Sequence, residues 1–328
     1  MGRVEKIELY KKASFVIVVF AGFLTVSSVY WDSWWHTSIG RESMWIPPHV
    51  GIFLGLGVAS IGFLIRFFND LKGGERLPKG YIYFIIGIAL IILSSPIDDL
   101  WHRKFGVEFV GSVLELWSPP HLLGLTSGLI ACYGVLRTLI KEGNRLRGRL
   151  FTSLITVQFA LLISIMTFIL LPFEPTSGLN FLGIFGIPFI FFPFMLFRWV
   201  SFYLLRRIGV LTLTAMINWI HLGILVSVHL AVRVGLVLAA GVLPAFVVDI
   251  VVYLTGNSVY RREAMVILSL TYSLIFSVLF YPTANYFGNL GYSILDMSLI
   301  VVLGAVAAAL AGYLSPVVTN AFVRRKIV

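Results

Sequence analysis

The residues of this sequence best suited to chemistry form two sets of one aspartate and two histidines: Asp32, His36 and His49, and then Asp98, His102 and His121. In each set the aspartate stands four residues before the first histidine, and the second histidine directly follows a Pro-Pro pair. If the segment from aspartate to histidine is helical, both side chains project from the same face. Each set could therefore hold a transition metal between two consecutive helices, with a coordination position left for water or substrate.

The donor types narrow the choice of metal. Two imidazoles and one carboxylate suit copper, iron or zinc, whereas magnesium and calcium prefer shells made only of oxygen. A haem would need two axial histidines on different helices, for example His36 and His102, and would use neither the aspartates nor the Pro-Pro pairs. The plainer alternative is a hydrogen-bonded Asp-His pair that holds a loop. Because the pattern occurs twice with the aspartate offset intact, we favour the metal site.

Further residues around each set are duplicated as well. They comprise Trp35, Gly40, Glu42 and Trp45 in the first copy and Trp101, Gly106, Glu108 and Trp117 in the second, which has six extra residues between its glutamate and its second tryptophan. We expect the glycines to end one helix and the prolines to begin the next. The glutamates could hydrogen-bond to the ligands. The tryptophans are expected to pack at a membrane interface and to limit water at the site.

The first set follows the spacing D-x3-H-x12-H. This pattern resembles the copper-binding triad in the C subunit of the particulate methane and ammonia monooxygenases. The resemblance implies copper bound by Asp32, His36 and His49, insertion of oxygen into C–H or N–H bonds, and action together with other membrane subunits. The second set has x18 in place of x12, so the resemblance in spacing is confined to the first.

The elements that must position these residues are membrane helices. Hydrophobic residues make up 59% of the 328 and charged residues only 12%, and the apolar blocks have the length of a transmembrane helix. Because backbone groups in lipid must pair within the segment, we predict an all-α integral membrane bundle. Ten spans are expected, at about 13–31, 48–69, 81–97, 120–139, 150–172, 181–204, 208–229, 233–255, 264–282 and 292–315.

The distribution of charge predicts the orientation of the bundle. The net charge of +10 could indicate a nucleic-acid partner, but 21 of the 25 lysines and arginines fall on the side of the N-terminus when the ten spans are drawn. Cytoplasmic loops carry this excess, so both termini are predicted inside the cell and both metal motifs on the extracytoplasmic side of the cell membrane. The basic charge therefore indicates a lipid bilayer as partner and not nucleic acid.

The duplication also suggests how the chain is organised. Residues 1–140 comprise two copies of an outgoing helix, a polar motif and a returning helix, which makes a parallel repeat with both motifs at one face. Residues 141–328 are expected to add six further helices to the same bundle. Cys132 is the single cysteine, which excludes an intrachain disulfide and metal sites built from cysteines.

The seventh predicted span holds three more polar residues, Asn218, His221 and His229. The two histidines are eight residues apart and lie on nearly the same helical face. They could support the metal ligands as hydrogen-bond partners or proton carriers, or they could simply form hydrogen bonds between helices.

Three functions are compatible with these observations. The first is a metal-dependent oxidoreductase resembling a copper monooxygenase, and the second is a membrane transporter for a metal ion or protons. The third is a structural subunit whose chemistry comes from a partner chain.

Overall fold

All regular structure in the described part of the chain is helical. The computed structural model describes residues 3–40, 43–74, 78–105, 118–146, 148–170, 180–226, 231–288 and 293–324. Within these ranges there is no strand, and each predicted span corresponds to one helix. The α-helices are α1 (Arg3–Ser38), α2 (Pro47–Lys72), α3 (Gly80–Phe105), α5 (Pro119–Leu146), α6 (Arg149–Leu170), α7 (Asn180–Leu205), α8 (Val210–Val226), α9 (Ala231–Thr255), α10 (Arg262–Gly288) and α11 (Ile294–Arg324), with a short 3-10 helix, η3 (Gly256–Tyr260), after α9. The predicted all-α bundle is thus confirmed.

The helices have the length and surface of membrane spans. Among the described residues, seven helices contain a stretch long and apolar enough to cross a bilayer, and α7, α8 and α9 contain shorter apolar stretches. Large apolar side chains point outward, including Phe20 at 70% exposure and Leu254 at 74%. Such residues are a liability in water, whereas in lipid they face a solvent as apolar as themselves. The chain is a multi-pass membrane protein.

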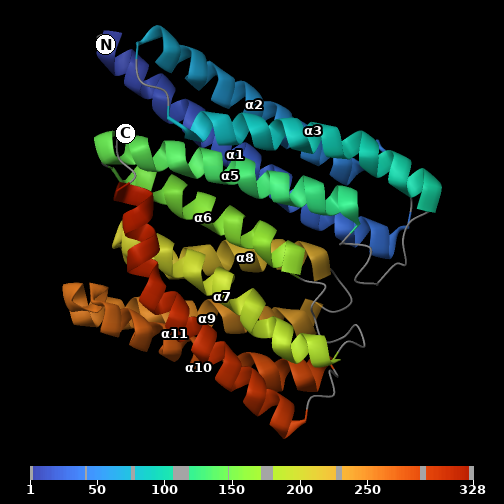
Figure 1. Cartoon of the computed structure of the whole chain (residues 1–328), viewed down its shortest axis with the longest axis vertical. Helices are drawn as coiled ribbons and strands as arrows, with labels where there is room; N and C mark the ends of the chain where they lie inside the picture. Colours follow the sequence, from blue (N-terminus) through green and yellow to red (C-terminus); the bar gives the residue numbers. More distant parts are fainter. Residues whose placement is uncertain are drawn as a thin grey trace. The chain divides into compact units, whose positions relative to one another are not determined.

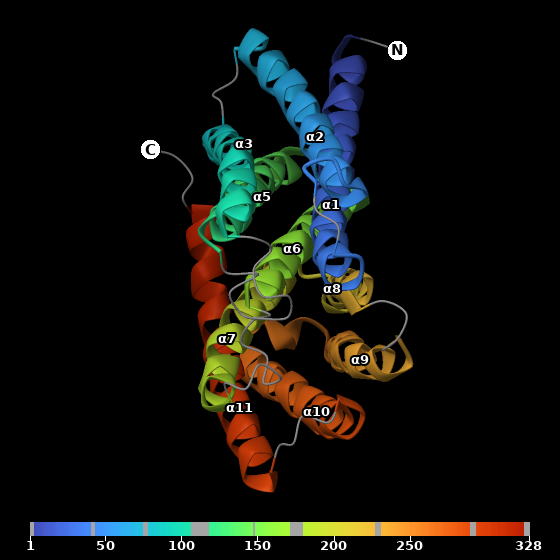
Figure 2. The same ribbon diagram turned by 90° about the vertical axis from the view of Figure 1, so that its right-hand side faces the viewer.

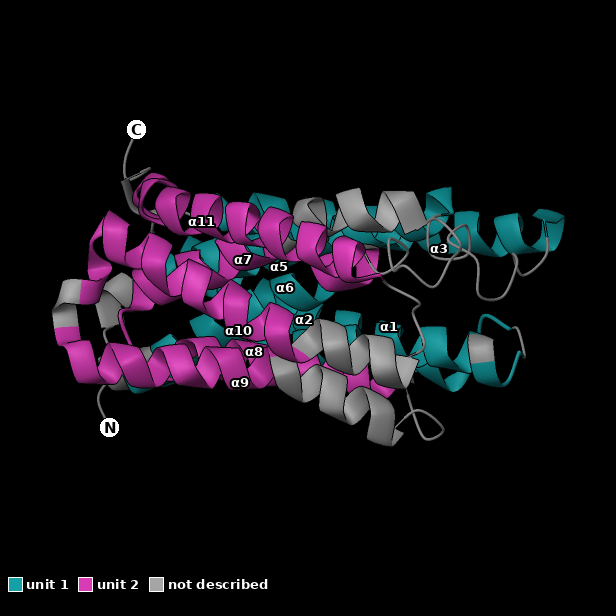
Figure 3. Cartoon of the chain, turned by 90° about the horizontal axis from the view of Figure 1, so that it is seen from below, with its two compact units in different colours: residues 1–165 teal, residues 166–328 magenta. Residues whose placement is uncertain are grey.

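The chain divides into two compact units, residues 1–165 and 166–328 (Figure 3). The duplicated segment 1–140 lies wholly within the first unit, where α1 packs against α2, and α3 packs against α5 (Figures 1 and 2). We call these two helix pairs the first and second hairpins. The helix α6 contacts both hairpins: the Tyr30 hydroxyl donates to the Ser164 carbonyl at 2.8 Å, and Gln158 Nε2 donates to the Cys132 carbonyl at 3.0 Å.

The two hairpins also repeat each other in how their helices pack. Gly62 lies 13 residues after His49, and Gly134 lies 13 residues after His121. A Cβ atom at Gly62 would face the carbonyl of Ser14, and one at Gly134 would face the carbonyl of Gly80. Ser14 and Gly80 each stand 18 residues before the aspartate of their own hairpin. The duplication visible in the motifs therefore extends along the whole length of the helices.

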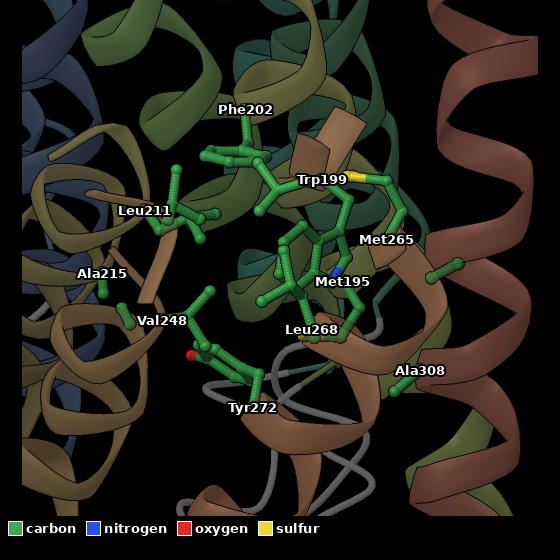
Figure 4. Close-up of a cluster of buried hydrophobic side chains, with 14 of the residues drawn as sticks. Met195, Trp199, Phe202, Leu211, Ala215, Val248, Met265, Leu268, Tyr272 and Ala308 are labelled. Atoms are coloured by element: carbon green, nitrogen blue, oxygen red, sulfur yellow. The ribbon is translucent and has the colours of Figure 1, made fainter. Parts of the chain in front are cut away.

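The second unit has an apolar core of its own. Side chains from α7 to α11, together with Val259 of η3, form the cluster drawn in Figure 4, with Trp199, Phe202 and Tyr272 among its largest buried members. Beside this core, the Asp249 carboxylate of α9 accepts hydrogen bonds from the backbone N–H and the hydroxyl of Thr212, at 2.9 and 2.6 Å. Asp249 thereby pairs with one of the N–H groups that the first turn of α8 leaves without a partner inside that helix.

Candidate metal centre

Local sequence signals set the positions of the first three candidate ligands. The helix α1 extends through Asp32 and His36 and ends at Ser38, after which Gly40 adopts a φ of +65° and donates its N–H to the carbonyl of Trp35 at 3.1 Å. A left-handed glycine of this kind is a common end for a helix, as predicted. Two prolines occupy the first positions of α2 and place His49 in its first turn.

The first set converges on a single carboxylate oxygen. Asp32 Oδ1 lies 3.5 Å from His36 Nε2 and 3.2 Å from His49 Nε2. The aspartate and the first histidine come from the last turns of α1, and the second histidine comes across from the start of α2. All three donor atoms lie within 4.8 Å of one another, so one ion could contact all of them. We call these three residues the first triad.

The second set, Asp98, His102 and His121, has the same geometry, and we call it the second triad. Asp98 Oδ1 lies 3.5 Å from His102 Nε2 and 3.2 Å from His121 Nε2. These distances match those of the first triad although the second connection is six residues longer. The packing of α3 against α5, and not the length of the connection, therefore sets this geometry.

The two triads lie side by side. The rings of His36 and His102 are nearly parallel, with an angle of 21° between their planes and 6.4 Å between their centroids. These histidines occupy corresponding positions in the two hairpins, so each faces its own counterpart. Such a contact is expected where parallel repeats meet about a pseudo-two-fold axis. The six residues make one paired centre.

The separations are compatible with a bound cation as well as with hydrogen bonds. A tetrahedral site with metal–ligand bonds of 2.0–2.2 Å spaces its donor atoms about 3.4 Å apart. The observed values of 3.2 and 3.5 Å lie on either side of that spacing. The longer one exceeds the usual range for an N–H···O hydrogen bond. In both triads the buried Oδ1 atom faces two imidazoles at once, which is the arrangement that a bound cation satisfies.

The centre is partly accessible and has an apolar wall. His36 is the most enclosed ligand, at 11% exposure, and His121 the least, at 27%. Phe53 lies one helical turn after His49, with 6.4 Å between the ring centroids, and packs in turn against Trp45. Trp45 itself is 74% exposed, which suits a residue at a membrane interface. Phe53 was missed by the motif comparison because it lies outside the duplicated residues, although its i+4 spacing from His49 could have indicated it.

Five of the predicted residues fall outside the part of the chain that the structure describes, namely Glu42, Glu108, His229, Gly106 and Trp117.

Asn218 and His221 belong to α8 in the second unit, and both are buried. Asn218 Nδ2 donates to the Thr167 hydroxyl at 3.2 Å, a hydrogen bond between helices of the kind that the sequence allowed. That His221 or Asn218 supports the metal ligands stays a prediction.

Comparison with known proteins returns no match: no family model, no curated protein and no solved structure matches this chain. The resemblance to the monooxygenase C subunit continues to rest on the residue types and spacing of the first triad.

Proposed function

We propose that this protein binds copper at its paired triads and uses it to oxidise a substrate at the extracytoplasmic face of the membrane. The observation that carries the proposal is the repeated convergence of one carboxylate oxygen and two imidazole nitrogens, with the same separations in both triads. Repetition of this geometry within one unit distinguishes it from a single histidine–aspartate pair that holds a loop.

Copper is favoured among the metals that this donor set accepts. Imidazole is a good ligand for copper, iron and zinc, but copper(II) binds most tightly of the divalent ions to a given site of this kind. The resemblance of the first triad to a copper-binding triad supports the same choice. Iron and zinc fit the donors too, so metal analysis of the purified protein is part of the test.

An oxidation is consistent with the position and openness of the centre. Three protein ligands leave room for an exogenous molecule on each metal, and the triads lie at the ends of apolar helices, where a substrate dissolved in the bilayer can reach them. When bound, copper supplies one-electron chemistry with dioxygen. The protein residues hold the metal, orient it, and restrict water on the Phe53 side. Electrons and protons must come from a reductant, for which other membrane subunits are the natural source.

Transport is the main alternative. Transporters commonly hold their ions near the bilayer midplane between broken helices. Here the ligands come from the ends of α1 and α3 and from the starts of α2 and α5, which favours chemistry at one face over passage through the bundle.

The test combines metal analysis with one double variant. Protein purified without chelators and supplied with copper, iron or zinc in turn should bind metal, and His36→Ala/His102→Ala should lose it while its helical circular dichroism is unchanged. Binding of none of the three metals, or full metal content in the double variant, would contradict the proposal. Oxygen-dependent product formation lost in the variant supports the oxidoreductase, whereas metal-coupled flux into vesicles supports a transporter.

A further inference from the structure

A buried charged cluster lies in the first unit far from the triads. Arg66 and Asp70 of α2 are each 1% exposed, and Glu142 of α5 is 2% exposed. Arg66 follows His49 by 17 residues, which places it about 25 Å further along the helix. Charged side chains that are almost fully buried in a membrane protein cost free energy unless they are paired. The contacts of this cluster therefore need an explanation.

The cluster joins the two hairpins to each other. Arg66 Nε donates to Asp70 Oδ2 at 2.9 Å within α2, and an Nη atom of the same guanidinium lies 3.1 Å from Glu142 Oε1 in α5. The Tyr81 hydroxyl of α3 donates to Asp70 Oδ2 at 2.7 Å. Lys11 of α1 adds a second cation 3.5 Å from Asp70 Oδ1. All four helices of the two hairpins thus meet at one polar cluster.

The duplication reveals an asymmetry in this cluster. Asp70 and Glu142 occupy corresponding positions, each 21 residues after the second histidine of its triad. Arg66 corresponds to Thr138, whose hydroxyl donates to the carbonyl of Gly134 within α5 at 2.9 Å. A single guanidinium therefore serves two corresponding carboxylates. The Arg66 guanidinium lies between Asp70 and Glu142, where the two hairpins contact each other. At the opposite end of the hairpins, the contact is between His36 and His102.

From this juxtaposition we infer that Arg66 is a positioning residue for the paired centre. Each triad is complete within one hairpin, so metal binding needs only the packing of α1 on α2 or of α3 on α5. The approach of one triad to the other depends instead on how the two hairpins are aligned. The shared guanidinium holds that alignment, because sliding one hairpin along the other would leave a buried charge without its partner. The inference rests on the proposed metal binding.

The pseudo-symmetry provides a rescue test. Thr138→Arg would place a guanidinium four residues before Glu142 on the same helix and opposite Asp70, which mirrors the present contacts. Position 138 faces Gly80, where the first hairpin has Ser14, and α3 and α5 are closely packed there, so the rescue is judged in protein that folds and binds copper at both triads. The ring beneath the new guanidinium would be Tyr81, the counterpart of Phe15, over which Arg66 now lies at 5.0 Å.

The measurement is electron paramagnetic resonance of the full chain loaded with copper(II). Two copper(II) ions in triads as close as these should give dipolar broadening and a half-field signal. We expect Arg66→Thr to bind copper at both triads but to lose the half-field signal, and Arg66→Thr/Thr138→Arg to recover it. Arg66→Lys keeps the charge but not the planar fork that spans two carboxylates, and should recover the signal only in part.

A further variant guards against misfolding. If Arg66→Thr does not fold, Arg66→Thr/Asp70→Asn/Glu142→Gln removes the three most buried charges together and leaves Lys11, which is 14% exposed. This variant should fold, bind copper at both triads and lack the half-field signal. An undiminished half-field signal in Arg66→Thr or in the triple variant would overturn the inference. So would the absence of that signal in Arg66→Thr/Thr138→Arg when this variant has bound copper at both triads. Failure of the wild-type chain to bind copper at all would overturn the proposed function instead, so the two failures are distinguishable.

Discussion

Two adjacent aspartates in α3 have different roles because their side chains project from different faces of the helix. Asp98 faces His102 and His121, whereas the next residue, Asp99, pairs with Arg103 at 2.8 Å on a more exposed face. A step of one residue turns the side chain by about 100° around the helix axis. Identical chemistry at neighbouring positions therefore yields a candidate ligand in one case and an ordinary surface ion pair in the other.

This difference gives a matched pair of variants. Asp98→Ala should halve the copper content of the loaded protein, because it removes the carboxylate of one triad and leaves the other intact. Asp99→Ala should leave the copper content unchanged and alter the stability by less than about 1 kcal/mol, as expected for a surface ion pair. Elemental analysis of both proteins after the same loading and washing provides the measurement. Equal copper contents in the two variants would exclude the second triad as a site.

Protons should compete with the metal at these histidines. Only neutral imidazole and ionised carboxylate can act as ligands, and an unperturbed histidine takes up its proton near pH 6.5. Occupancy should therefore be high above about pH 7 and should fall as the pH drops below about 6. Equilibrium dialysis against a fixed free copper concentration over this range tests the expectation. Occupancy that rises on acidification would show that the histidines are not the ligands.

At the scale of helices, close packing positions the second triad. A methyl group at Gly134 would lie 2.5 Å from the backbone nitrogen of Phe84 and 2.6 Å from the carbonyl of Gly80, so α3 and α5 touch almost backbone to backbone. At the corresponding Gly62 the nearest atom is a methyl carbon of Val18, at 3.1 Å. At this pair of positions the second hairpin is thus the more tightly packed and the less tolerant of added volume.

Gly134→Ala is consequently expected to push α3 away from α5. Overpacking of this kind costs about 1–3 kcal/mol, and the shift should weaken copper binding at the second triad, whose ligands come from both helices. Gly62→Ala should have a smaller effect on both quantities, and Gly57→Ala, where the added methyl meets open space, should have almost none. Thermal unfolding in detergent together with copper analysis would rank the three. A ranking with Gly62→Ala as the most damaging would contradict this account.

At the scale of the whole molecule, the orientation in the membrane is open to direct test. The excess of lysine and arginine on one side predicts that the ends of α1 and α3 face the extracytoplasmic side. Ser38 is exposed at the end of α1, beside the first triad. In a Cys132→Ala background, Ser38→Cys should react with a membrane-impermeant maleimide added to intact cells. Labelling seen only in inverted vesicles would reverse the predicted topology.

Much of this protein could be predicted from its sequence because the relevant signals are local. The apolar blocks indicated each helix, the offset of four residues placed Asp32 and His36 on one helical face, and Gly40 marked the end of α1. Each of these features depends on the period of the helix or on backbone preferences at its ends, which neighbouring residues determine.

Contacts between the two hairpins could be identified only from the tertiary structure. No spacing indicates that His36 faces His102, or that one guanidinium lies between Asp70 and Glu142. The equal distances in the two triads could not be predicted either, because the two histidines of the second triad are six residues further apart in the chain than those of the first. These features depend on how close two helices approach and at what depth their side chains interlock, and that is set by the packing of residues far apart in the chain.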